Sequence, residues 1–131
     1  MPFVIGRTDG DLDLDSLVGQ LGDAFPESIL ISDDYYRDRL ERMKEIAQKL
    51  GMAEDCAPIR CMERVALEHG TQRHLAVRIS QDITFDARID RFGILAVGGQ
   101  DTVECRDVVQ RLIGILQAYN LEIETSWGDD K

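Results

Sequence analysis

Two cysteines and two histidines fall within nineteen residues of this sequence: Cys56, Cys61, His69 and His74. Thiolate and imidazole groups are ligands that zinc prefers, and a hairpin turning at Gly70 would bring the two histidines toward each other. However, seven residues separate Cys61 from His69, whereas a familiar zinc finger has about twelve at this point. We therefore expect no cofactor, and keep a zinc site on these four residues as an alternative.

One of these cysteines could instead act as a nucleophile, which requires a base within hydrogen-bond reach and a third group that orients the base. The predicted strands could gather Cys61 with His74 and with Asp82 or Asp86. No nucleophile elbow or flanking signature accompanies them. A small cysteine- and histidine-dependent hydrolase or transferase is thus an alternative function, with the candidate catalytic residues Cys61, His69, His74 and Asp86.

Aspartates occupy alternate positions from Asp9 to Asp15, a pattern that invites comparison with a calcium loop. An EF-hand loop that starts at Asp9 would need glycine at its sixth position and glutamate at its twelfth. The sequence has Leu14 and Gln20 there. We expect these aspartates to cap a helix and to complement its dipole instead.

The charge of the chain is concentrated in its first third. The 131 residues carry a formal charge of −10, and residues 1–36 hold eight acids against one basic residue, Arg7. Such a field opposes binding to nucleic acid and to anionic membranes, and it favours a protein partner with a basic surface. The candidate interaction residues are Asp9, Asp11, Asp13, Asp15, Asp33 and Asp34.

No targeting or membrane-spanning segment is evident in the sequence. Residues 1–7 lack the basic and apolar regions of a secretory signal, and no stretch approaches the ~18 apolar residues of a spanning helix. Three cysteines make an odd number, which suits reduced thiols better than a disulfide framework. We therefore expect a cytoplasmic protein.

The apolar pattern predicts three helices and seven strands. Apolar residues at helical spacing predict helices over about residues 14–25, 33–50 and 101–119. Short apolar runs and period-two alternation predict strands near residues 3–5, 28–31, 64–68, 74–80, 83–90, 94–97 and 121–127. The third helix has a capping box at Asp101 and Glu104 and an apolar arc wide enough to be deeply buried or to contact a second chain.

This order of elements, β-α-β-α-β-β-β-β-α-β, predicts an α+β fold. We expect two layers, with a largely antiparallel sheet and three helices mainly on one face. Residues 1–131 would form a single domain, with a sub-boundary at the linker-like residues 51–58 or two separate small sheets as alternatives.

For function, the sequence favours a non-enzymatic interaction or regulatory module that binds a basic partner. The concentrated negative charge supports this hypothesis, and the wide apolar arc of the third helix suggests a homodimer. Besides the hydrolase or transferase, the alternative is a sensor that holds a small ligand between the sheet and the helices.

Overall fold

Six strands form one antiparallel sheet in the computed structural model, which describes residues 2–80, 82–99 and 102–126. The strands are β1 (Phe3–Arg7), β2 (Ile29–Ser32), β3 (Arg73–Arg78), β4 (Thr84–Asp90), β5 (Gly93–Gly98) and β6 (Glu122–Ser126). Their order across the sheet is β2-β3-β4-β5-β1-β6, and every neighbouring pair is antiparallel. The predicted α+β fold with an antiparallel sheet is confirmed, and the two halves of the chain share that one sheet.

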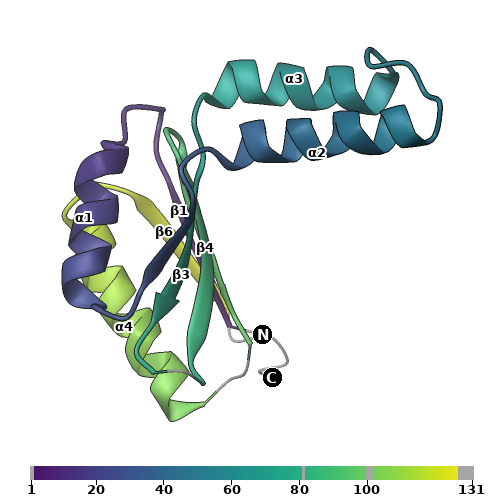
Figure 1. The fold of residues 1–131 in the computed structure, drawn as a ribbon. Helices are drawn as coiled ribbons and strands as arrows, with labels where there is room; N and C mark the ends of the chain where they lie inside the picture. Colours follow the sequence, from purple (N-terminus) through teal and green to yellow (C-terminus); the bar gives the residue numbers. More distant parts are fainter. Residues whose placement is uncertain (1, 81, 100–101, 127–131) are drawn as a thin grey trace.

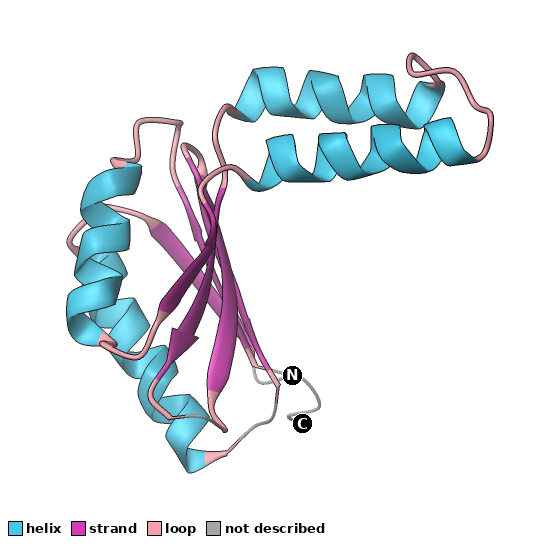
Figure 2. Cartoon of the chain, in the orientation of Figure 1, coloured by secondary structure: helices cyan, strands magenta, loops and turns pink. Residues whose placement is uncertain are grey.

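The helices divide into two groups (Figures 1 and 2). Helices α1 (Leu14–Ala24) and α4 (Val103–Gln117) cover one face of the sheet. Helices α2 (Tyr35–Lys49) and α3 (Ala57–His69) form an antiparallel hairpin that projects away from one end of the sheet. None of the described helices therefore forms a layer on the other face of the sheet.

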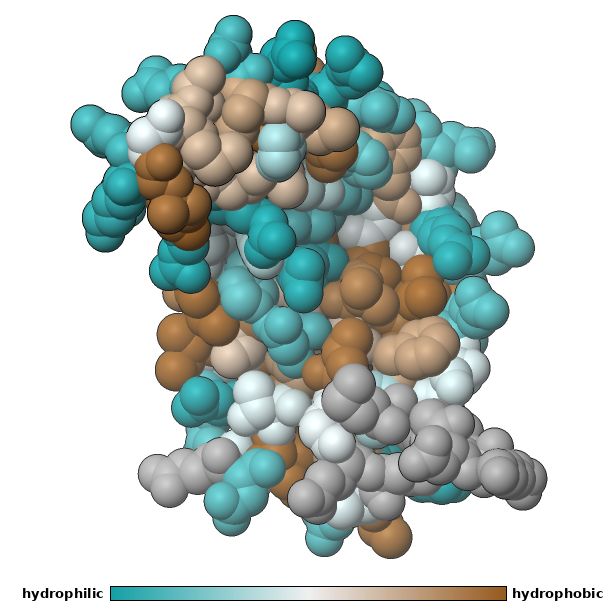
Figure 3. Space-filling view, turned by 90° about the vertical axis from the view of Figure 1, so that its right-hand side faces the viewer, coloured by the Kyte–Doolittle hydropathy of each residue, from teal (hydrophilic) through white to brown (hydrophobic). Residues whose placement is uncertain are grey.

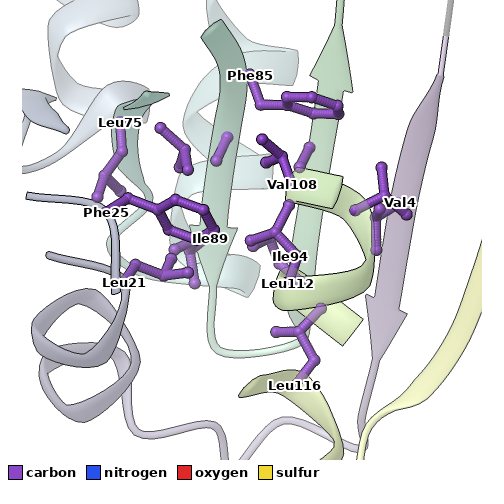
Figure 4. Close-up of a cluster of buried hydrophobic side chains, with 14 of the residues drawn as sticks. Val4, Leu21, Phe25, Leu75, Phe85, Ile89, Ile94, Val108, Leu112 and Leu116 are labelled. Atoms are coloured by element: carbon purple, nitrogen blue, oxygen red, sulfur yellow. The ribbon is translucent and has the colours of Figure 1, made fainter. Parts of the chain in front are cut away.

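A hydrophobic core fills the space between the sheet and the helices α1 and α4 (Figure 4). It includes Val4, Leu21, Phe25, Leu75, Phe85, Ile89, Ile94, Val108, Leu112 and Leu116. Alternate residues of β4 enter it, namely Phe85, Ala87 and Ile89. Five residues of α4 are buried within the chain, and this burial accounts for part of the wide apolar arc of the helix.

Several helix boundaries follow from local chemistry. Asp13 accepts a hydrogen bond from the backbone N–H of Ser16 at 3.1 Å and caps α1. Thr102 caps α4, whereas the predicted cap at Asp101 lies outside the described residues, as does Trp127 at the end of the last predicted strand. Asn120 follows α4 with a φ of 56°, in the left-handed conformation that asparagine tolerates at a helix end.

The segment that was predicted as a linker and a strand folds differently. Residues 57–69 form the helix α3, so the described part of the chain contains four helices rather than three, and one strand fewer than predicted. Residues 51–56 are the turn between α2 and α3. Buried Ile59 lies on α3, which packs along α2, while Leu67 on the same helix is 87% exposed.

None of the described helices has both the length and the apolar composition that crossing a bilayer requires.

Candidate functional site

Charged residues gather on the open face of the sheet, where the helical hairpin begins and ends. The strand β4 alternates between the two faces, so the residues between its core positions are Asp86, Arg88 and Asp90. Both ends of the hairpin contact this row of charges. Tyr35 and Tyr36 come from the start of α2, and His69 comes from the end of α3.

Asp90 is the centre of the first cluster. It is 92% buried, and its Oδ2 accepts hydrogen bonds from the Tyr36 hydroxyl at 3.1 Å and lies 3.1 Å from Nδ1 of His69. Its Oδ1 accepts the backbone N–H of Phe92 at 2.9 Å. A buried carboxylate costs much less free energy when such donors surround it. This cluster therefore joins β4 to both helices of the hairpin.

Tyr36 remains protonated in this environment. Burial, the charge of Asp90 and the hydrogen bond to Asp90 together raise the pKa of its hydroxyl to about 12, against the opposing effect of Arg88. Gln72 also donates to the Tyr36 oxygen at 3.2 Å. The hydroxyl thus acts as a fixed donor to Asp90, and the cluster stabilises the base of the hairpin.

His74 forms the second cluster with residues from α2 and β4. Its Nε2 contacts the carboxylate of Asp86, and its ring stacks on Tyr35 with 5.3 Å between ring centroids. The guanidinium of Arg88 lies 4.9 Å from the centroid of the same tyrosine, which is a cation–π distance. These contacts fix the direction in which α2 leaves the sheet.

A cleft of about 330 Å³ adjoins this second cluster, between the end of β2 and the first turns of α2. It is lined by Ile31, Ser32, Tyr35, Asp38, Arg39, Arg42 and His74. The hydroxyl of Ser32 donates to Asp38 and not to His74. The cleft therefore offers apolar and polar contacts, and the two hydroxyls that line it are already engaged, that of Ser32 with Asp38 and that of Tyr35 with Arg39.

The structure separates the candidate catalytic residues of the sequence. His74 does lie against Asp86, but His69 binds Asp90 in the other cluster. Cys61 is an exposed free thiol on α3, and no hydrogen bond within the described residues links it to either histidine. A nucleophile held next to its base, which the hydrolase hypothesis requires, is not assembled by these residues.

The candidate zinc ligands are also divided. Cys56 caps the start of α3, Cys61 lies one turn further along, and the two histidines bind different carboxylates. Over residues 2–80, 82–99 and 102–126, no three His, Cys, Asp or Glu side chains lie close enough to hold a metal ion together.

The acidic residues of the sequence lie in two segments at the same end of the sheet. Asp9, Asp11, Asp13 and Asp15 lie between β1 and the first turn of α1, and all four are exposed. The carboxylate of Asp15 lies 2.8 Å from the guanidinium of Arg73 at the start of β3. The next residue, His74, is opposite Ser32 in β2, and Asp33 and Asp34 follow directly. The two acidic segments therefore flank the same end of the sheet.

Sequence reasoning missed Asp90, Tyr36 and Tyr35 as parts of a site. The period-two alternation did place Asp86, Arg88 and Asp90 on one face of a strand, and this was the available signal. Their partners could not be identified because they lie on a helical hairpin whose second helix was predicted as a strand.

No family model, curated protein or solved structure matches this chain.

Proposed function

We propose that this chain is a non-enzymatic protein-interaction module that binds a partner with a basic surface. The observation that carries the proposal is the position of two acidic segments, residues 9–15 and 33–34, at the same end of the sheet, where the aspartates are exposed except for the partly buried Asp34. Only Asp15 among these residues has an ion pair with a basic side chain in the described part of the chain. A cluster of like charges at one place attracts a partner of opposite charge and speeds encounter with it.

The polar clusters around Asp90 and His74 support this proposal because their contacts serve to position the hairpin. Both carboxylate oxygens of Asp90 and Nε2 of His74 are engaged in contacts within the chain that orient the hairpin. A rigid sheet with an anionic corner and a projecting hairpin offers surface for contact with another protein. The net charge of −10 opposes a nucleic-acid or anionic-membrane partner.

A charge-neutralising variant tests the proposal. Asp9→Asn, Asp11→Asn and Asp33→Asn together remove three exposed negative charges from residues that hold no cap or ion pair in the structure. We expect proteins captured from a lysate on the immobilised chain to be enriched in basic proteins at low salt. The triple variant should reduce this capture several-fold, and raised salt should abolish it.

The matched control is Glu41→Gln, Glu45→Gln and Glu63→Gln, which changes the net charge equally on the exposed surface of the hairpin. It should leave the captured set unchanged. Equal loss in both triple variants would mean that only total charge matters, and absence of any basic partner at low salt would refute the proposal.

A further inference from the structure

The strand β2 lies at one edge of the sheet and, among the described residues, pairs only with β3. The backbone N–H and C=O groups on its outer side are therefore available to another strand. Proteins ordinarily protect such edges with charged side chains, prolines, β-bulges or a covering segment. The register of β2 on β3 shifts between Leu30 and Ser32, but the centre of β2, Ile29-Leu30-Ile31, has no charge and no proline.

These three apolar side chains are exposed on both faces of the sheet. Ile29, Leu30 and Ile31 are 49%, 43% and 56% exposed. Leu30 is opposite the core residue Leu75 and so faces the helical layer, whereas Ile29 is opposite Ala76 and faces the open side. Figure 3 looks onto that open side, and apolar atoms gather there below the hairpin. An added strand would therefore meet apolar contacts on both of its faces.

The two ends of β2 carry negative charge. Glu27 precedes the strand, and Asp33 and Asp34 follow it. If β2 of a second copy paired antiparallel about Leu30, Glu27 of each copy would lie beside Asp33 of the other. Like charges directly opposite each other destabilise a strand pair. The charge pattern thus disfavours a second copy and suits a strand with basic ends.

From these observations we infer that β2 binds an extended segment of the partner as a seventh strand of the sheet. The segment would have an apolar, β-branched centre with lysine or arginine on either side. This inference rests on the proposed function and assigns its binding mode. Backbone hydrogen bonds to β2 would supply affinity, and the flanking acids would select the basic ends.

The cleft beside the hairpin base adds a contact for one side chain of the bound segment. Its wall includes Ile31 and Ser32 from β2, so it opens next to the strand on the open side of the sheet. Asp38 and the two arginines Arg39 and Arg42 line it together. Because these charges have both signs, the cleft suits an uncharged side chain, and the basic residues of the partner belong at the ends of its strand.

Three labelled peptides separate this inference from charge attraction alone. The first has a central alternation of valine and threonine between pairs of lysines, the second has the same sequence with alternate central amides N-methylated, and the third has a glycine-serine centre between the same lysines. We expect the first to bind at least ~10-fold more tightly than either control in fluorescence anisotropy, since ~1.4 kcal/mol of backbone and apolar contact is tenfold. Amides of β2 should gain protection from hydrogen exchange only with the first peptide.

Paired protein variants locate the binding edge. Ile29→Ser with Ile31→Ser should weaken binding of the first peptide about tenfold without changing binding of the glycine-serine peptide. The control, Leu67→Ser with Val103→Ser, changes two exposed apolar residues on helices and should leave both affinities unchanged. Thermal unfolding of each variant checks that the fold is retained.

The possible failures are distinguishable. Equal binding of all three peptides would agree with the proposed acidic interaction module but would overturn the inference that the partner binds as an added strand. Absence of binding by every lysine-flanked peptide at low salt would contradict the proposed function as well. A dimer in light scattering that dissociates in the Ile29→Ser, Ile31→Ser variant would mean that a second copy occupies the edge, and it would overturn the inference.

Discussion

At the scale of single residues, Asp90 links parts of the chain that are far apart in sequence. It is within hydrogen-bond distance of His69, 21 residues before it, and of Tyr36, 54 residues before it. The alternating pattern of β4 could predict the face on which Asp90 lies. It could not predict that Asp90 would be buried, because the residues that cover it belong to a hairpin fixed by packing between α2 and α3.

Tyr36→Phe tests this cluster through its pH dependence. The substitution removes the hydroxyl that donates to Asp90, so the free energy of unfolding should fall by about 1–2 kcal/mol at pH 8. The pKa of Tyr36 is raised from 10.0 in the unfolded chain to about 12 in the folded chain. Its stabilising effect is therefore complete below pH 10 and is lost as the pH rises toward 12.

Urea unfolding of both proteins between pH 8 and 12 measures this effect. The difference in free energy of unfolding between the two proteins should shrink over the upper half of the range. A constant difference up to pH 12 would show that the folded chain does not favour the protonated hydroxyl.

At the scale of elements, the sequence correctly predicts those elements in which apolar periodicity is combined with capping or terminating residues at the ends. The helix predicted over residues 33–50 is α2, and Gly51 follows it with a left-handed φ of 70°. The strand predicted over 64–68 was wrong because Val65 and Leu67 alternate with polar residues over too few positions to distinguish periods. Ile59, Met62 and Ala66 fit the helical period, and this longer pattern governs the segment.

Glycines in two kinds of element should respond oppositely to substitution by alanine. Gly19 and Gly22 lie within α1, where an added Cβ would meet no atom within 4 Å, so each alanine should stabilise the fold by about 0.5–1 kcal/mol. Gly93 starts β5 with a φ of 147°, and its Cβ would lie 1.8 Å from the carbonyl oxygen of Gly6. Gly93→Ala should cost more than ~3 kcal/mol.

Thermal and urea unfolding of the three single variants measure these effects. A tolerated alanine at position 93 would contradict the close approach of β5 to β1. Loss of stability at position 19 or 22 would show that the surface of α1 is covered by something beyond the described residues.

At the scale of the whole molecule, the hairpin and the sheet are stabilised separately. The core cluster draws on β1, α1, β3, β4, β5 and α4 and includes no residue of α2 or α3. The hairpin begins and ends at one place, since the backbone N–H of Tyr35 donates to the carbonyl of Gln72 at 2.5 Å (Figure 1). The sequence predicted a single layer of helices, because amphipathic periodicity shows which side of a helix is buried but not which element buries it.

This separation predicts that the hairpin can be removed without loss of the sheet. Replacing residues 35–69 with a short glycine-serine linker keeps every member of the core cluster. The two ends of the replaced segment lie close together, so a short linker can span the distance between them. The deletion removes Tyr36 and His69, which cover Asp90, so the carboxylate of Asp90 becomes exposed to water and is not left as a buried unpaired charge. We expect cooperative urea unfolding and the β-strand signal of the sheet in circular dichroism, with the helical signal reduced. Non-cooperative unfolding of the shortened chain would mean that the hairpin is required for the sheet to fold.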